Sequence, residues 1–401
     1  MRQRPRRRLA VVTTHPIQYY APWFRWMTAN SREIELKVFY LWNRGTEAKH
    51  DPGFGRAVQW DVPLLDGYEH EFIPNLARVP GSDRFWGIRN EGVGSRIRAF
   101  APHAALLLGY RYASLMRLIF TPERMRGYPL IFRGDSHRIS ASRSAKWKVE
   151  SRKAVISQVY RRFAAFLYVG QANGDYFRIH GVPEEKLFFA PHAIDNERFI
   201  GSADAAGEAA KAWRRSLGIP EDHLVILFAA KFEEKKRPFD LLAAFAALGR
   251  DDVSLLFVGN GQLEEELRTR AGGARNVLFA PFQNQSEMPR TYAACDLFVL
   301  PSFGPEESWG LAVNEALCLA RPVIVSDHVG CAADLVRHGQ TGLVFPAGDV
   351  PALTEALRNA LSGRERLREW GIAGREIVRN YDYAHATAGL ERALRQVGSR
   401  K

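Results

Sequence analysis

Short apolar runs rich in β-formers alternate with helical stretches along nearly the whole chain, and this alternation limits the possible folds more than any other feature. Apolar runs punctuated by Gly or Pro and followed by amphipathic helices are typical of βαβ units, in which helices cover both faces of a parallel sheet. One series of runs occupies residues 9–13, 36–41, 104–108, 130–133 and 166–169. A second series occupies residues 224–228, 254–258, 277–280, 297–300, 322–326 and 342–345. Two such series predict two α/β domains in tandem, facing each other across a cleft.

The length of 401 residues agrees with two domains, because single domains usually contain about 100–200 residues. We predict a first domain over residues 1–195 and a second over residues 196–379, with a polar, small-residue-rich linker within residues 195–222. Residues 380–401 are expected to form a helical segment that returns to the first domain. In open parallel sheets ligands bind at the carboxyl ends of the strands, so functional motifs should lie in loops that follow strands.

The composition is that of a globular protein and gives no sign of disulfides or a cysteine zinc site. Hydrophobic residues make up 46% of the chain and charged residues 25%, which excludes a disordered or collagen-like protein. The three cysteines, Cys295, Cys318 and Cys331, form no C-x-x-C pair and suit a reducing cytosol. The sequence has no apolar run of about 18 residues that would span a bilayer. The apolar run after the basic N-terminus is too short for a signal peptide, so we expect a cytoplasmic protein with a basic arm on its first strand.

The net charge of +12 indicates an anionic partner but leaves a nucleotide, a membrane surface and a nucleic acid open. Residues 138–162 concentrate this charge, with Glu150 as the single acid. The basic residues of this segment are Arg138, Arg143, Lys146, Lys148, Arg152, Lys153, Arg161 and Arg162. Interleaved apolar residues give the segment the pattern of a basic amphipathic helix that lies on an anionic membrane, and a solvated basic face is the alternative.

Two glutamates in the second series have the most informative surroundings. A predicted strand ends near Pro301, a Gly/Pro loop carries Glu307, and a helix is expected to begin near Gly310. The free N–H groups and positive dipole end of that helix form an anion site suited to phosphate. Glu315 lies roughly 8 Å further along the helix axis, because each residue adds about 1.5 Å. Two carboxylates so spaced can bind different hydroxyl-bearing parts of one ligand, although Glu307 alone also suits a solvated loop.

Glu307 and Glu315 have seven residues between them, and the first begins the sequence Glu307-Ser-Trp-Gly-Leu311. In this spacing and in the E-x-F-G-L pattern the chain resembles glycosyltransferase family 4, whose members have the GT-B fold of two Rossmann-like domains. The resemblance implies that Glu307 faces the donor sugar and that Glu315 binds the ribose hydroxyls. It also implies that Trp309, Gly310 and Leu311 lie at the donor.

A second match follows the predicted strand at residues 224–228. Lys231 and Lys236 stand where the resembled family has an Arg and a Lys, five positions apart, that bind the donor diphosphate. Lysine keeps the charge of arginine but loses its bidentate fork. The resemblance implies that both lysines stabilise the leaving diphosphate, and the alternative is a solvated run of charge.

Two further segments of the second domain match the resembled family by position. The turn Gly259-Asn-Gly261 follows a strand and is expected near the donor diphosphate, although a lone G-x-G is weak evidence for a nucleotide site. Phe282 lies in the loop that, by resemblance, contacts the nucleotide base through its backbone. Neither segment identifies the base.

The first domain matches the family less closely. A polar, aromatic turn with His15 and Gln18 replaces the family's Gly-Gly loop, which indicates an acceptor or interdomain contact. His15 suits a helix cap or the core equally well. Asp135 and His137 follow the strand at residues 130–133 and resemble the segment that places a His or Asp near the anomeric carbon. For His137 the alternative is an ordinary histidine at a strand end.

These matches predict a glycosyltransferase that moves a sugar from a nucleoside diphosphate sugar to an acceptor hydroxyl. The resemblance implies retention of the anomeric configuration, no metal and no cofactor besides the donor, with the acceptor on residues 1–195 and the donor on residues 196–379. We expect a saccharide or lipid-linked acceptor, bacterial polysaccharide or glycolipid synthesis, and a peripheral position at the inner face of the membrane, without nucleic acid. The open alternatives are a sugar-nucleotide epimerase, a phosphorylase, and a non-catalytic binder of nucleotide sugars or nucleic acid.

Overall fold

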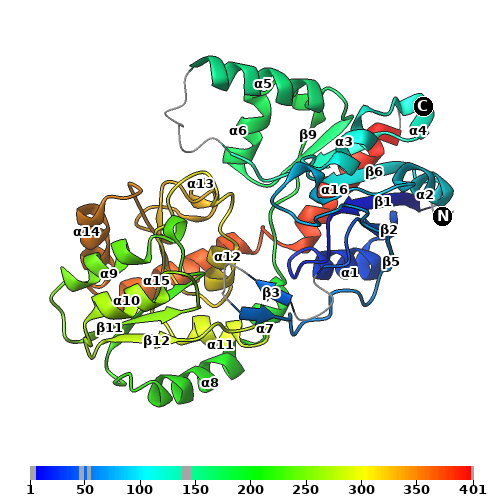
Figure 1. Ribbon diagram of the computed structural model, residues 1–401. Helices are drawn as coiled ribbons and strands as arrows, with labels where there is room; N and C mark the ends of the chain where they lie inside the picture. Colours follow the sequence, from blue (N-terminus) through cyan, green and yellow to red (C-terminus); the bar gives the residue numbers. More distant parts are fainter. Residues whose placement is uncertain (1–5, 45–48, 52–55, 138–145, 399–401) are drawn as a thin grey trace.

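The computed structural model describes residues 6–44, 49–51, 56–137 and 146–398, which form two lobes, each built on its own parallel sheet (Figure 1). The first sheet contains, in spatial order, β5 (Glu69–Phe72), β2 (Ile34–Tyr40), β1 (Arg7–Thr13), β6 (Ala104–Leu108), β7 (Leu130–Arg133), β8 (Ala165–Tyr168) and β9 (Leu187–Phe189). The second contains β12 (Val277–Ala280), β11 (Val253–Val258), β10 (Leu224–Ala229), β13 (Leu297–Leu300), β14 (Val323–Ser326) and β15 (Gly342–Phe345). A short antiparallel pair, β3 (Lys49–Asp51) and β4 (Arg56–Val58), belongs to neither sheet. The predicted fold class, two Rossmann-like α/β domains, is confirmed.

Helices cover both faces of each sheet. Those that precede β10 are α1 (Ala21–Asn30), α2 (Val93–Phe100), α3 (Ala113–Phe120), α4 (Glu123–Arg126), α5 (Lys146–Tyr160), α6 (Gln171–Ile179), α7 (Asn196–Gly201) and α8 (Ala203–Ser216). Those that follow it are α9 (Pro238–Ala246), α10 (Glu264–Ala271), α11 (Met288–Ala293), α12 (Leu311–Cys318), α13 (Ala332–Leu335), α14 (Val350–Ala360), α15 (Arg364–Val378) and α16 (Tyr383–Gly398). The part of the chain that the structure describes also contains the short 3-10 helices η1 (Phe85–Gly87), η2 (Glu184–Lys186) and η3 (Glu234–Lys236).

The side chains of β1 show how the first sheet is enclosed. Leu9 and Val11 point into a core shared with α1 and α16, whereas Ala10 and Val12 point into a second core shared with α2 and α3. All four are fully buried, because successive side chains of a strand alternate between two covered faces. This explains why the central strands are continuous apolar runs in the sequence.

The segment 195–222 differs from our prediction of a linker. It contains α7 and α8, and α8 packs against α11 of the second domain. Ala206 and Ala210 form the buried side of α8, and small residues there let the helix approach its neighbour closely. The prediction was wrong because a composition rich in Ala and polar residues suits an amphipathic helix as well as a loop.

The last helix, α16, lies against the first sheet although it follows α15 of the second domain (Figure 1). Leu390 and Leu394 join the core of the first domain, and Trp23 Nε1 donates a hydrogen bond of 3.0 Å to Thr387 Oγ1. At Gly389 a Cβ atom would lie only 2.1 Å from the carbonyl oxygen of Phe189, so this crossing requires glycine. The chain therefore passes between the two domains twice.

Candidate active site

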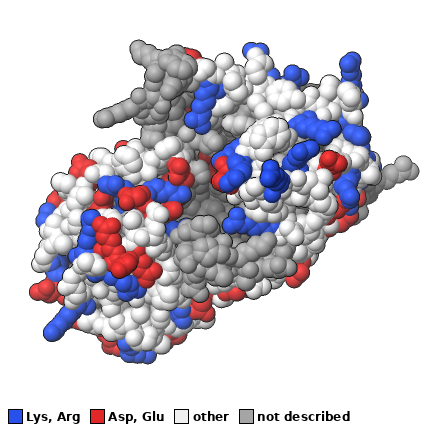
Figure 2. All heavy atoms as spheres, in the orientation of Figure 1, with Lys and Arg blue, Asp and Glu red and all other residues white. Residues whose placement is uncertain are grey.

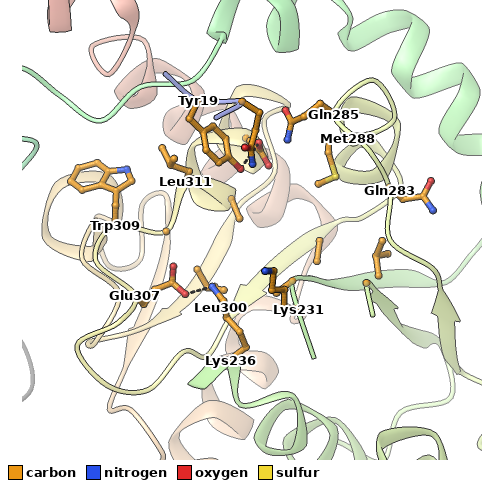
Figure 3. Close-up of a pocket in the computed structure, with 18 of the residues that line it drawn as sticks. Tyr19, Lys231, Lys236, Gln283, Gln285, Met288, Leu300, Glu307, Trp309 and Leu311 are labelled. Carbon is orange, nitrogen blue, oxygen red and sulfur yellow. Dashed lines mark hydrogen bonds and ion pairs between the residues drawn. The ribbon is translucent and has the colours of Figure 1, made fainter. Parts of the chain in front are cut away.

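A cavity of about 480 Å³ lies between the two domains, at the carboxyl ends of both sheets (Figure 3). The first domain contributes Gln18, Tyr19, Trp60, Asp135 and His192 to its lining. Of the second-domain residues predicted from the sequence, the lining includes Lys231, Lys236, Gly259, Phe282, Glu307, Trp309, Gly310, Leu311 and Glu315. The structure thus brings together residues that are spread over nearly 300 positions of the chain. His15, His137 and Gly261 are the predicted site residues that do not line it.

Glu307 and Lys236 form an ion pair at the cavity wall, drawn as a dashed line in Figure 3. Lys236 ends η3, which follows β10, and Glu307 lies in the loop after β13. Ser302 Oγ donates a second hydrogen bond of 2.8 Å to Glu307 Oε2. Burial would raise the pKa of the Glu307 carboxyl, but the Lys236 ammonium and the Ser302 hydroxyl outweigh it and hold the pKa below its usual value. Glu307 is therefore ionised near neutral pH, and its charge is balanced by Lys236.

Cationic groups and a helix N-terminus meet beside this ion pair. Lys231 and Lys235 line the same cavity, and α12 begins there after Gly310. Gly310 has φ 94°, and a Cβ atom on it would lie 2.8 Å from Val329 Cγ1, so glycine is needed to start the helix in this position. Ammonium groups and free N–H groups at a helix start together make a site for a phosphate-bearing ligand.

Glu315 lies on α12 and is 2% exposed. Tyr292 OH donates a hydrogen bond of 2.7 Å to Oε2, and Tyr19 OH of the first domain donates one of 3.3 Å to Oε1. Burial raises the pKa of Glu315 to about 7, although the two phenols and the nearby Arg198 favour the ionised form. The carboxyl group is thus buried at the cavity wall with both oxygens already hydrogen-bonded, one from each domain.

The two glycines of the turn after β11 have different surroundings. Gly259 lines the cavity, with φ 145°, and a Cβ atom on it would lie 2.1 Å from the Ala230 carbonyl oxygen. Gly261 lies outside the cavity lining and packs on Phe232, whose carbonyl oxygen would be 2.4 Å from an added Cβ. Both glycines therefore let this turn lie directly on the segment that carries Lys231.

The loop containing Phe282 contacts the first domain. The rings of Trp60 and Phe282 meet edge to face with centroids 6.1 Å apart. Asp61 accepts hydrogen bonds from the backbone N–H of Ser286 at 3.2 Å and from its hydroxyl, and Asn284 Nδ2 donates 2.6 Å to the Gln59 carbonyl oxygen. The first domain thus covers one side of the loop predicted to contact the base.

Asp135 and His137 reach the loop that carries Glu307. Ser308 Oγ donates a hydrogen bond of 2.6 Å to Asp135 Oδ2, and His137 Nε2 lies 3.1 Å from the backbone oxygen of Glu307. His192 Nε2 is 3.9 Å from Asp135, and its ring stacks on Tyr20. His137 therefore supports the loop from behind, while Asp135 and His192 line the cavity.

His15 lies outside the cavity lining. Its Nδ1 is 2.9 Å from Thr14 Oγ1, and its ring meets Trp42 edge to face. Burial, together with the nearby Arg44, lowers the pKa of His15 to about 4, so the imidazole is neutral at pH 7. Gln18, three residues later, does line the cavity.

Trp309 is buried where the two domains meet. Its Nε1 donates a hydrogen bond of 2.8 Å to Asn314 Oδ1 within α12, and its ring packs near His192 and Tyr381. A Cβ on Gly170 would lie 2.3 Å from the Trp309 ring, so the first domain leaves room for it with a glycine. Trp309 thus stabilises the start of α12 and also packs against the first domain.

Sequence reasoning missed several residues of this site, among them Tyr19, Trp60 and Tyr292. Tyr19 and Trp60 reach the cavity only because the two domains meet, which local spacing does not reveal. An aromatic residue beside Gln18 in a strand-to-helix turn was the available signal for Tyr19.

The described part of the chain contains neither a cluster of metal-ligating side chains nor a membrane-spanning helix. Within residues 6–44, 49–51, 56–137 and 146–398, three or more His, Cys, Asp or Glu side chains are nowhere grouped as metal ligands. In the same part of the chain no helix has both the length and the apolar character needed to cross a membrane.

Two facing Rossmann-like domains with a cleft between the carboxyl ends of their parallel sheets are the arrangement of the GT-B fold. Residues 209–377 match the family Glycosyl transferases group 1. Most of the second domain thus matches that family, which confirms the resemblance drawn from Glu307 and Glu315.

Curated relatives and solved structures agree with this placement. The phosphatidyl-myo-inositol mannosyltransferase of Mycobacterium leprae is 33% identical over 187 residues, which cover 45% of this chain and 49% of that protein. The D-inositol 3-phosphate glycosyltransferase of Nocardia farcinica is 29% identical over 224 residues, which cover 53% of this chain and 48% of that protein. The chain thus spans about half the length of the curated relatives it matches.

The fold likeness extends over nearly the whole chain. Anabaena HepE in complex with UDP and glucose superposes with a TM-score of 0.70 at 16% identity, covering 97% of this chain and 100% of that one. The sucrose-phosphate synthase of Thermosynechococcus elongatus gives a TM-score of 0.70 at 18% identity, covering 99% of this chain and 100% of that one. At these identities the likeness establishes the two-domain fold.

Proposed function

We propose that the protein is a glycosyltransferase that moves a sugar from a nucleoside diphosphate sugar to an acceptor hydroxyl. The observation that carries the proposal is the cavity in which Lys231, Lys236 and the start of α12 face Glu307 and Glu315. The match of residues 209–377 to the group 1 family supports it. Residues 196–379 then hold the donor, residues 1–195 the acceptor, and 380–401 tie the two together.

In this mechanism the diphosphate lies against Lys231, Lys236 and the N–H groups that begin α12. The Lys236 ammonium carries three donors, so it can hold Glu307 and a phosphate oxygen at once. Fixed cations stabilise the charge that develops on the leaving diphosphate without reorganising during the reaction. Glu315 accepts hydrogen bonds from the ribose hydroxyls, and Glu307 faces the transferred sugar.

We further propose that transfer retains the anomeric configuration and needs no metal ion. The acceptor hydroxyl attacks from the side that the diphosphate leaves, and a leaving phosphate oxygen takes its proton. Asp135 and His192 lie on the first-domain side of the cavity, where they can orient the acceptor. Gly259 and the loop with Phe282 complete the donor side.

The acceptor is proposed to be a saccharide or a lipid-linked saccharide, in polysaccharide or glycolipid synthesis at the cytoplasmic face of the membrane. The names of two curated relatives refer to inositol-containing compounds, and one of these is the lipid phosphatidyl-myo-inositol. The names of other relatives and neighbours mention both GDP-mannose and UDP, so they do not select one base. In the basic segment 138–162, which first indicated a membrane, residues 138–145 and the side chains of residues 146–149 lie outside what the structure describes.

Product analysis tests the transferase against its alternatives. Purified protein is incubated with each of UDP-, GDP- and ADP-sugars, with and without a crude glycolipid acceptor, inorganic phosphate or a divalent metal. A transferase consumes donor only with acceptor, and NMR of the product gives the anomeric configuration. An altered donor without acceptor indicates an epimerase, dependence on phosphate indicates a phosphorylase, and an unreacted panel indicates a non-catalytic binder.

A further inference from the structure

The excess positive charge of the chain belongs to its first domain. Residues 1–195 contain 31 Lys and Arg against 17 Asp and Glu, whereas residues 196–401 contain 25 against 27. Figure 2 shows basic side chains over the lobe of the first domain and mixed charges on the other lobe. Because the proposed donor site lies in the second domain, binding of the donor does not account for this charge.

Exposed apolar side chains gather in the same domain. Among the described residues, eight of the ten exposed large hydrophobic side chains lie before residue 180. Four of them, Leu76, Val79, Phe85 and Trp86, lie within residues 76–89, which we call the docking loop, and are between 41% and 67% exposed. Soluble proteins seldom expose several large apolar side chains together without a partner for them.

The docking loop is held in place by the protein beneath it. Asn75 Nδ2 donates a hydrogen bond of 2.9 Å to the Gly87 carbonyl oxygen. Arg111 donates one of 2.8 Å to the Asp83 carbonyl oxygen, and Tyr112 OH donates one of 2.9 Å to that of Ser82. These hydrogen bonds hold the loop backbone in one conformation, and in that conformation the apolar side chains are exposed.

The position of the docking loop relates it to the cleft. It follows β5, and the residues that support it, Arg111 and Tyr112, follow β6. Gln18 and Tyr19 of the cavity follow β1. In a parallel sheet the carboxyl ends of the strands share one edge, so the docking loop lies on the edge of the first domain where the cleft opens.

We propose that the docking loop inserts Phe85 and Trp86 into the surface of an anionic lipid bilayer. Arg78 and Arg89 are exposed on the same loop, where their guanidinium groups can pair with lipid phosphates as the aromatic rings enter the interface, whereas Arg84 is paired with Asp83 of the loop at 3.0 Å. Aromatic side chains with adjacent cations are suited to this boundary. Docking by this loop turns the first-domain edge of the cleft toward the membrane, where the cleft can bind a membrane-borne acceptor. The binding of such an acceptor rests on the proposed function, whereas the docking itself does not.

The test is sedimentation of the full chain with vesicles of phosphatidylcholine alone or with phosphatidylglycerol. The double variant Phe85→Ser, Trp86→Ser is compared with Ile372→Ser, which removes a side chain that is 44% exposed on α15 of the second domain. We expect the wild type and Ile372→Ser to bind the anionic vesicles, and the double variant to bind at least about tenfold more weakly. Arg78→Gln should lower the affinity of the protein for anionic vesicles about fivefold at low salt.

Two results would overturn the docking proposal: a wild type that ignores anionic vesicles, or a double variant that binds them as well as the wild type does. If the double variant binds vesicles like the wild type but loses turnover on a soluble saccharide, the loop is a binding surface for a sugar. The melting-temperature shift caused by a nucleoside diphosphate is measured on the same samples. Its absence from all of them would contradict the proposed function and leave the docking result standing.

Discussion

The phenol of Tyr19 lies 3.3 Å from Glu315 Oε1, so a side chain of the first domain contacts a carboxyl group buried in the second. Tyr292, from α11 of the second domain, holds the other oxygen at 2.7 Å. The group that we propose to bind the ribose is therefore oriented by both domains. Binding of the nucleotide should depend on how the domains meet, which predicts effects for residues outside the donor domain.

Replacing Tyr19 with Phe should weaken nucleotide binding and change its dependence on pH. Glu315 accepts hydrogen bonds from the ribose hydroxyls best when it is ionised. The affinity for the nucleotide should therefore fall as the pH drops below the Glu315 pKa of about 7. Loss of the Tyr19 hydrogen bond disfavours the ionised form and should move this midpoint to higher pH. Calorimetric titration with a nucleoside diphosphate between pH 5.5 and about 9 measures the shift.

Tyr20→Phe is the matched control for this experiment, because the neighbouring phenol faces Arg133 and Asp135 instead. It should leave the midpoint where it is in the wild type. A midpoint that stays in place in Tyr19→Phe, or moves equally in both variants, would show that Tyr19 does not act through Glu315.

Glu315→Gln should stabilise the protein while it removes nucleotide binding. The pKa of Glu315 is raised to about 7, so the folded state holds its proton more tightly than the unfolded chain does. Its contribution to stability is therefore present at low pH and is lost as the pH rises from about 4.5 to 7. At pH 8 the glutamine variant should be more stable by up to about 3 kcal/mol, and near pH 4 it should match the wild type.

Urea unfolding at both pH values measures this difference. Equal stability at pH 8 would mean that the carboxyl group is not strained by burial, and retained nucleotide affinity would remove its role in binding.

Lys236→Ala should lower turnover about 100-fold or more, because it removes a fixed cation from the proposed diphosphate site. It also leaves the Glu307 carboxylate without its ion-pair partner. Steady-state kinetics against Lys211→Ala, which removes an exposed lysine of α8, separates a local effect from a loss of net charge. Near-normal turnover in Lys236→Ala would exclude this residue from the mechanism.

His137→Ala should reduce transfer more than nucleotide binding. Its imidazole contacts the backbone oxygen of Glu307 at 3.1 Å and so positions the loop that faces the donor sugar, while the lysines and Glu315 stay in place. Turnover and the nucleotide-induced rise in melting temperature are measured on the same preparation. Equal losses in both would indicate that His137 maintains the fold of the cleft as a whole.

The six strands of the second sheet were predictable because each is a short apolar run in the sequence, and most of these runs are buried on both faces of the sheet. In the first domain two edge strands were missed: β9, because it has only three residues, and β5, because its sequence Glu69-His-Glu-Phe72 is polar. Lys37 pairs with Glu69 and Glu71 across that edge, an arrangement that apolar periodicity does not reveal. Helix α8 was missed for a related reason, because only a narrow alanine face of it is buried.

Within the site, the residues on the loops of the second domain were predictable from spacing and position. Those that cross the cleft were not. Tyr19 and Trp60 reach second-domain groups that follow them by more than 200 positions, and such contacts depend on how two separately folded sheets meet. His15 shows the opposite case, because a histidine in a promising turn faces Trp42 and Thr14 outside the cavity lining.

The central claim, that the cleft binds a nucleoside diphosphate sugar through the second domain, is tested most directly by calorimetric titration of UDP, GDP and ADP without metal. The account predicts that one of them binds the wild type with a stoichiometry of one. It also predicts that Lys236→Ala and Glu315→Gln each weaken that binding at least about tenfold, while Lys211→Ala does not. Binding by none of the three, or equal binding by all four proteins, would contradict it.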